Sequence, residues 1–395
     1  MVAMACLGGW GDLPPDLLDV VADALPLEDY TRVRAVCTAW RAALPPTLPS
    51  LLVRRLDGGC HRFSTWCLSA ATAVLQCPPT MLSPTRRCVG SGSGPGWIAV
   101  CGPEVVGLVN PLTGEEIPFR SFPQRGLVVS KIVFAPNPTA RDFTAVVISD
   151  HACFTGRGRI AYTTRGNGGW AHVEVPGLPR RDGIADVVYH DKGGGKKVAY
   201  CLTGSGDVHV LHLPAGRHGQ RRRRPLPPSF QRLFDKASMV FYPTVAFAPP
   251  YDDATRRTEN AKNLVLCHDG HFYQIWRNKC NDEMLVLRYY PRRRPCWVAA
   301  KDLGGFSVFI GQNNAVALRV DGSGGAATPG LRRNCVYWID GSRNEAKVFD
   351  METGKSSPCF PNGDEAHAAI CWCYMGTGVA KSPHHVHVQK RARRV

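Results

Sequence analysis

The chain of 395 residues lacks the patterns that mark membrane and secreted proteins. It has no apolar run of roughly 18 or more residues, the length that a membrane-spanning helix needs. Its first residues, MVAMACLGGWGDLPPD, have no basic segment ahead of an apolar one and turn acidic early, unlike a secretory signal peptide. We therefore expect a soluble protein inside the cell, nuclear, cytoplasmic or both, with its 16 cysteines as reduced thiols.

Motifs of common enzymes are also missing. Neither G-x-S-x-G nor H-E-x-x-H occurs. The stretch GSGSGPGW at residues 90–97 cannot supply G-x-G-x-x-G, because Pro95 and Trp97 take required positions, and HDKGGGKK at residues 190–197 lacks the spacing of a phosphate-binding loop. We predict turns at both places, no cofactor, and no bond chemistry by the chain itself.

No C-x-x-C pair is present, which removes the commonest zinc signature. The nearest alternative is Cys371 and Cys373 followed by His384, His385 and His387, which can hold zinc if the tail folds back. We favour an arrangement in which the two cysteines share one face of a terminal strand and the histidines lie in a disordered tail. The sequence therefore predicts no metal site.

Acidic residues are scarce outside the N-terminal segment. Asp and Glu number 32 against 48 Lys and Arg, and the net charge of +16 combines about −3 in residues 1–50 with about +19 in the remainder. Basic runs beside prolines are typical of solvated loops, with import signals or a patch for an acidic partner as alternatives. These runs are the arginines at 221–224, those at 292–294, and Lys390, Arg391, Arg393 and Arg394.

Two amphipathic helices are predicted near the N-terminus. Asp12 can cap the first, and Pro14 and Pro15 occupy its first turn, where a missing N–H costs nothing. Pro26 ends this helix, and a pair of prolines after Leu44 ends the second. Apolar residues recur at helical spacing in both: Leu17, Leu18, Val21 and Leu25, then Val33, Val36, Cys37, Trp40 and Leu44.

Two such helices carry more apolar surface than they can bury against each other. A helical hairpin packed on its own domain is one explanation. The residues favour a docking module, because L-P-x-[DE]-[LI]-[LIV], then L-P-L, then R-[AV]-V-C-x-x-W-R resembles the F-box over about 35 residues. The resemblance implies that residues 8–46 bind a Skp-type adaptor through Leu13, Pro14, Leu17, Leu18, Leu25, Val33, Val36, Cys37 and Trp40.

The rest of the chain has the sequence pattern of an all-β protein. Its 40 glycines and 31 prolines separate short β-type segments, about seventeen of them from Arg87 onward. Two segments, VVGLVNPLTG at 105–114 and AKVFDMETG at 346–354, share a pattern: an apolar strand that ends in Asn or Asp, then two residues, then Thr-Gly. Such repetition is typical of the blades of a propeller. We predict a small all-α F-box followed by a large all-β domain, a β-propeller of roughly four to six blades. Its expected boundaries are 85–375, after a linker at 47–84 and before a basic, histidine-containing tail at 376–395.

Several segments of this region are similar to plant F-box proteins with a C-terminal kelch-like propeller, among them RRCVGSGSGPGWIAV, LVNPLTGEEIPF and NCVYWIDGSRNEAKVFDMETG. The resemblance implies the substrate-recognition subunit of an SCF-type E3 ubiquitin ligase. The F-box would bind the Skp adaptor, and through it a cullin, while the propeller binds a target protein at residues that the sequence does not identify. We expect no catalysis and no membrane or nucleic-acid partner. A basic nuclear or nucleic-acid-associated scaffold and a propeller hydrolase remain as alternatives.

Overall fold

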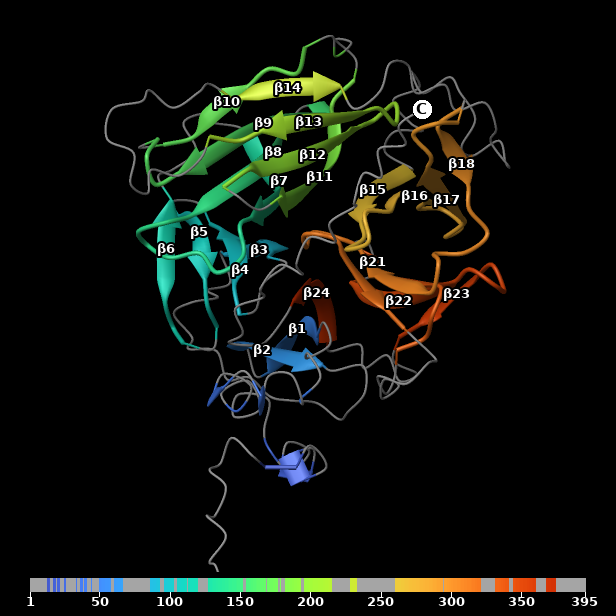
Figure 1. The fold of residues 1–395 in the computed structure, drawn as a ribbon. Coiled ribbons are helices and arrows are strands. Elements are labelled where there is room, and N and C mark those ends of the chain that lie inside the picture. The colour runs from blue at the N-terminus through green and yellow to red at the C-terminus, as the bar shows by residue number, and fades with distance from the viewer. Residues whose placement is uncertain are drawn as a thin grey trace, which may run out of the picture.

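The computed structural model describes single positions between residues 13 and 44 and then residues 50–66, 86–119, 127–214, 228–232, 260–320, 331–359 and 367–373, with short gaps inside these ranges. Within this part of the chain the strands form six sheets (Figure 1).

Four of the sheets contain four antiparallel strands each, paired in chain order. The first two comprise β3 (Arg87–Ser91), β4 (Ile98–Cys101), β5 (Val106–Val109) and β6 (Glu116–Phe119), then β7 (Leu127–Phe134), β8 (Thr144–His151), β9 (Phe154–Thr164) and β10 (Ala171–Val173). The next two comprise β11 (Ile184–Asp191), β12 (Lys197–Thr203), β13 (Val208–His212) and β14 (Ser229–Arg232), then β15 (Asn260–Leu266), β16 (Phe272–Asn278), β17 (Met284–Tyr289) and β18 (Trp297–Ala299).

The fifth and sixth sheets depart from this pattern. The fifth has the order β20-β19-β21-β22-β23, and its β19 and β21 are parallel. The sixth has the order β2-β1-β24, so it joins the start of the described β region to its end. Their strands are β19 (Phe306–Phe309), β20 (Val316–Arg319), β21 (Cys335–Asp340), β22 (Glu345–Asp350) and β23 (Lys355–Pro358), and β1 (Ser50–Asp57), β2 (Cys60–Trp66) and β24 (His367–Cys373).

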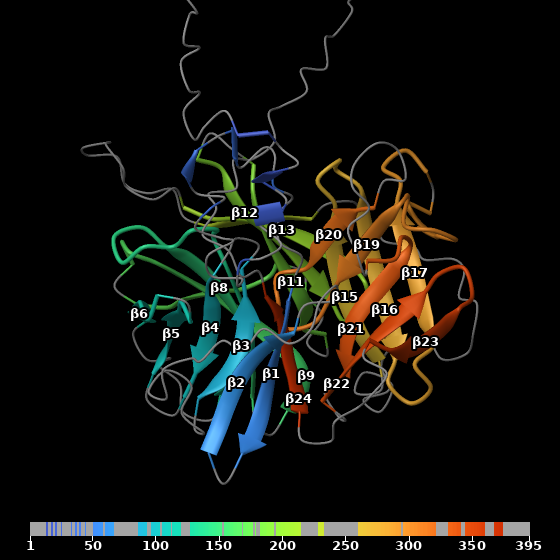
Figure 2. The same ribbon diagram turned by 90° about the horizontal axis from the view of Figure 1, so that it is seen from below.

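The six sheets follow one another around a closed ring. β3 contacts β7, β7 contacts β11, and β11 contacts β15. β15 contacts β20, and β24 contacts both β21 and β3, which completes the circuit (Figure 2). The predicted large all-β domain of propeller type is confirmed.

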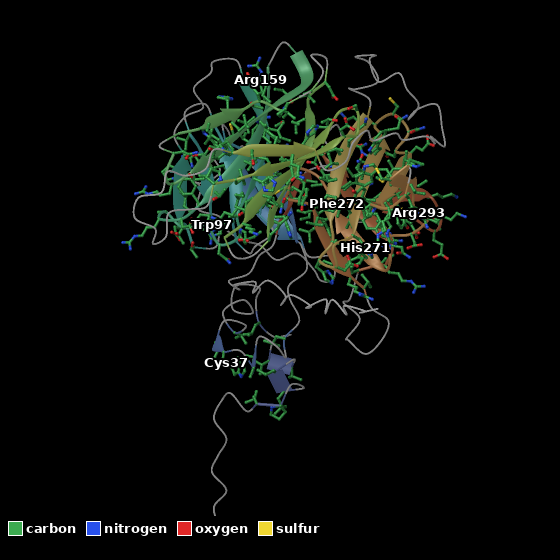
Figure 3. The ribbon with its side chains drawn as sticks, turned by 45° about the horizontal axis from the view of Figure 1, so that its top comes forward. Cys37, Trp97, Arg159, His271, Phe272 and Arg293 are labelled. Atoms are coloured by element: carbon green, nitrogen blue, oxygen red, sulfur yellow. The ribbon has the colours of Figure 1, made fainter. Side chains whose placement is uncertain are left out.

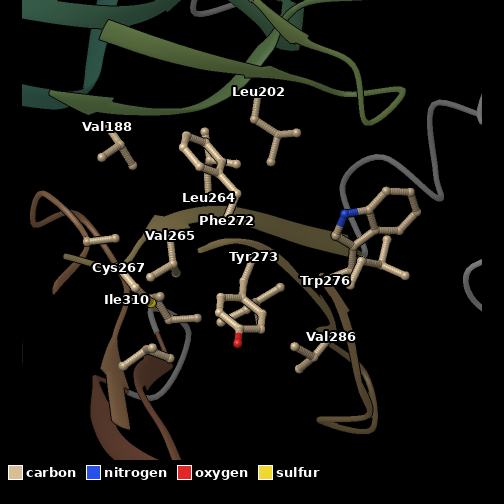
Figure 4. Packing of buried hydrophobic residues seen from close by; sticks show 14 of the residues in the cluster. Val188, Leu202, Leu264, Val265, Cys267, Phe272, Tyr273, Trp276, Val286 and Ile310 are labelled. Atoms are coloured by element: carbon tan, nitrogen blue, oxygen red, sulfur yellow. The ribbon is translucent and has the colours of Figure 1, made fainter. Parts of the chain in front are cut away.

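The hydrophobic core lies between the sheets, so strands are covered on both faces. In the largest cluster Val188 and Leu202 come from β11 and β12, Trp276 from β16 and Ile310 from the segment after β19 (Figure 4). β16 is buried along almost its whole length, because one sheet packs against each of its faces. Burial on both faces explains why apolar residues follow one another along such strands. In a sheet with one face in water, apolar and polar residues would alternate.

Residues 50–66 belong to the ring and are not the linker that we expected over 47–84. β1 pairs along its length with β2 on one side and β24 on the other, and Leu51 and Leu52 are almost completely buried. The partner strand β24 lies at the other end of the described chain, so no local pattern could show this pairing. The β domain therefore begins at Ser50 or earlier.

In the N-terminal segment the backbone is helical at Leu17, Leu18, Val20 and Val21. It is helical again at Val33, Val36, Ala39 and Trp40, which we call the second helical group. Among the described residues, no helix has the length and apolar character needed to cross a membrane.

Candidate functional site

The N-terminal segment presents an apolar surface to solvent. Leu17, Val20 and Val21 are 55%, 67% and 44% exposed, and their i, i+3, i+4 spacing places them on one side of a helix. Val36, in the second helical group, is 62% exposed. We call these four residues the N-terminal apolar face.

A small core lies beneath this surface. Leu18, Trp40 and Leu44 are buried together, and Leu13, Val33 and Cys37 pack against them (Figure 3 labels Cys37). The backbone N–H of Trp40 donates to the Cys37 sulfur at 3.4 Å. This cluster holds the two helical groups together.

The structure therefore divides the nine residues that the motif assigned to adaptor binding. Leu17, Val36 and Pro14 are exposed, and Leu25 is half-buried. Sequence reasoning missed Val20, although its position three residues after Leu17 was a usable signal. The buried or packed members are Leu13, Leu18, Val33, Cys37 and Trp40. Adaptor binding by any of the nine stays a prediction.

The inner strands of three sheets meet at a buried ion pair. The Lys131 ammonium on β7 donates to Asp186 Oδ1 on β11 at 2.6 Å, and both side chains are buried. Asp186 Oδ2 accepts the backbone N–H of Leu264 on β15 at 2.8 Å. Both carboxylate oxygens are therefore engaged in holding strands together, which suits a structural role better than acid–base chemistry.

Replacing Lys131 with methionine should lower the free energy of unfolding by about 3–5 kcal/mol, because the Asp186 carboxylate stays buried without its counter-ion. Urea denaturation measures the loss. The matched control is Arg86→Met, which removes the more exposed pair of Arg86 with Glu116 (3.2 Å) and should cost at most about 1 kcal/mol. Equal losses in the two variants would contradict the structural role of the buried pair.

The segment between β19 and β20 also ties sheets together. Asn314 Oδ1 accepts the N–H of Tyr189 at 2.9 Å, and its Nδ2 donates to the Tyr189 carbonyl at 3.2 Å. The N–H of Asn314 donates to the carbonyl of Ser91 at 2.9 Å. One side chain and its own backbone thus join β11 and β3 to the fifth sheet.

The two glycine-rich stretches are strand–turn–strand connections, as predicted. Ser91 pairs with Ile98, and Asp191 pairs with Lys197. A Cβ on Gly90 would lie 1.9 Å from the Ile132 carbonyl oxygen, so glycine is needed here for close packing of β3 against β7.

A second group of charges lies between the fourth and fifth sheets. The Arg277 guanidinium lies 4.0 Å from the ring centre of Trp338 and pairs with Asp282 at 3.2 Å. Lys347 reaches the same carboxylate at 2.7 Å and lies 5.2 Å from the same ring. Burial lowers the pKa of Arg277, against the opposing effect of Asp282. These contacts join the two sheets through Trp338.

At one end of the fourth sheet, the turn between β15 and β16 and the segment that follows β17 combine cations with aromatic rings. Arg288 lies 5.3 Å and Arg293 4.4 Å from the ring centre of Tyr290. Arg288 donates to His271 Nε2 at 2.7 Å, and His271 Nδ1 lies 2.9 Å from Asp269 (Figure 3 labels His271 and Arg293).

The basic runs are only partly visible. Arg292 and Arg293 are exposed, as predicted for a solvated loop. Arg294, the arginines at 221–224, the C-terminal run and the rest of the 376–395 tail lie outside the described residues.

Cys371 and Cys373 are buried on β24. Cys371 lies beside Cys88 of β3, with 3.3 Å between the sulfurs, and both are free thiols. The three histidines of the zinc alternative lie outside the described residues. In the described part of the chain, no group of three or more His, Cys, Asp and Glu side chains has a geometry that could hold a metal ion.

A comparison with protein families matches residues 67–350 to the KIB1-4 beta-propeller family. No curated protein matches the chain. The WD40 domain of SCAP from fission yeast is 12% identical with a TM-score of 0.29; the match covers 62% of this chain and 50% of that one. An exo-β-1,3-galactanase from Clostridium thermocellum is 10% identical with a TM-score of 0.32, and the match covers 70% of this chain and 66% of the galactanase. A fucose-specific lectin from Aleuria aurantia is 11% identical with a TM-score of 0.29, and the match covers 84% of this chain and 93% of the lectin. Likeness at this level assigns no function.

Proposed function

This chain belongs to the KIB1-4 β-propeller family, and we propose that it is the substrate-recognition subunit of an SCF-type E3 ubiquitin ligase. In this proposal residues 8–46 bind a Skp-type adaptor and through it a cullin. The propeller binds the target protein, and ubiquitin transfer belongs to other subunits. The similarity to plant F-box proteins with a kelch-like propeller supports this division of labour.

The proposal rests on the location of the exposed apolar side chains, most of which lie in the N-terminal segment. Among the described residues, the large hydrophobic side chains that are exposed are the N-terminal apolar face and Val128 of β7. Clustered apolar surface of this kind is costly in water and typical of a protein–protein contact. It lies in the segment whose sequence resembles the F-box.

The arrangement of the propeller supports a binding role over a catalytic one. The buried charges at Lys131 and Asp186, and those around Trp338, are paired with each other and join neighbouring sheets. A hydrolase needs groups directed at a substrate. The end of the fourth sheet around Tyr290 presents Arg288 and the exposed Arg293 beside an aromatic ring, which suits recognition of an anionic partner.

A pull-down with and without residues 1–46 tests the proposal. The full chain should retain the adaptor and the cullin, and residues 47–395 should lose both while keeping the target. Residues 47–395 retain β1 and β2, so their thermal unfolding should match that of the propeller in the full chain.

Adaptor binding by residues 47–395, or none by the full chain, contradicts the proposal. In that case steep salt dependence of binding to nucleic acid would favour the scaffold alternative.

A further inference from the structure

Two thiols meet at the seam where the ring of sheets closes. Cys88 lies on β3 and Cys371 on β24, 283 positions apart in the sequence. Their sulfurs are 3.3 Å apart. β24 is also the strand that pairs with β1, so this contact lies where the two ends of the β domain come together (Figure 2).

The surroundings of the pair are apolar and closely packed. Leu52, Ile98, Val100 and Val109 form one cluster with the two thiols and with Cys373. Cys88 and Cys371 are 7% and 0% exposed. Cys371 is opposite Leu52 in the β1–β24 register, next to an irregularity in that pairing, and β3 has a register shift just after Cys88.

The two thiols differ in acidity. The hydrogen bond between Cys88 and Cys371 lowers the pKa of Cys88, against the opposing effect of burial. Hydrogen bonds with Cys373 and with Cys88, together with burial, raise the pKa of Cys371. Cys88 is therefore the sulfur that ionises first, and a thiolate is the species that attacks a disulfide.

We propose that Cys88 and Cys371 are a reversible disulfide site, which locks the closing sheet β2-β1-β24 onto the first sheet when a disulfide oxidant such as glutathione disulfide is present. The Cys88 thiolate attacks the oxidant, forming a mixed disulfide and releasing one glutathione thiolate. Cys371 then loses its proton and attacks the Cys88 sulfur, which releases the second glutathione. Two protein thiols are oxidised, one glutathione disulfide is reduced to two glutathione molecules, and these take up the two protons.

Geometry favours this reaction within the native fold. An S–S bond is about 2.05 Å long, so the two sulfurs need to approach by only about 1 Å, and the strands that carry them already lie in contact. Burial makes local opening of the seam the step that admits the oxidant. A bond that closes so long a loop strongly restricts the unfolded chain. In a reducing cell both cysteines remain thiols, and the disulfide forms when the surroundings become oxidising.

The test uses the full chain, incubated with glutathione disulfide, blocked with N-ethylmaleimide and digested without reduction. Mass spectrometry should find the Cys88 peptide linked to the Cys371 peptide, and dithiothreitol should reverse the link. The melting temperature of the oxidised protein should rise by about 5–10 °C.

Matched variants separate this site from general thiol oxidation. Cys88→Ala and Cys371→Ala should each lose both the link and the rise in melting temperature. Cys201→Ala, which removes another buried free thiol on β12, should keep both. Mass spectrometry of the linked peptides from the wild-type protein identifies the paired cysteines even if a variant misfolds. Linkage through other cysteines only, such as mixed disulfides at the exposed Cys280, overturns the proposal, as does a Cys88–Cys371 link that leaves the melting temperature unchanged.

Discussion

Replacing Leu17 with aspartate should abolish binding of the Skp-type adaptor and leave the propeller folded. Leu17 is 55% exposed, so the change costs the free chain little. At the interface it would bury an unpaired carboxylate, at a cost of several kcal/mol, and a loss of about 4 kcal/mol weakens binding about a thousandfold. Titration calorimetry with the purified adaptor measures the effect, and circular dichroism checks the fold.

Two controls make this result specific. Val128→Lys places a charge on the exposed apolar residue of β7 opposite Asp150, and should leave adaptor binding unchanged. Leu18→Asp places the charge in the small core with Trp40 and Leu44, and should unfold the N-terminal segment as well as abolish binding. Wild-type affinity for the Leu17 variant would refute the N-terminal apolar face as the docking surface.

A fragment that begins at residue 85 should lose the cooperative unfolding transition that residues 47–395 retain. The shorter fragment lacks β1 and β2, which leaves the pairing edge of β24 uncovered. It also removes Leu51 and Leu52 from two clusters of the core. Each buried leucine contributes roughly 2–5 kcal/mol, and domains of this kind are stable by only about 5–15 kcal/mol.

Differential scanning calorimetry of the two fragments measures this effect. A fragment of residues 67–395, which lacks the same two strands but keeps the following segment, should behave like residues 85–395. If residues 85–395 melt with the same midpoint and enthalpy as residues 47–395, then β1 contributes nothing to ring closure and the domain boundary predicted from sequence is the correct one.

Local sequence patterns are enough to predict the class of fold. Short apolar runs between glycine and proline clusters predict many strands wherever they occur, because strand and turn preferences act over a few residues. The same local character revealed the turns at residues 90–97 and 190–197. It also made the F-box resemblance readable, since the motif lies within about 35 consecutive residues.

Which residues face each other depends on contacts between segments that are distant in the chain. Leu17 and Leu18 are neighbours of the same chemistry, yet one is exposed and the other is buried, because packing against Trp40 selects between them. Lys131 with Asp186, Cys88 with Cys371, and β1 with β24 are pairs distant in the chain. Packing between neighbouring sheets joins Lys131 to Asp186, and closure of the ring joins the other two pairs. Contacts between distant segments leave no periodic signal in the sequence around either partner.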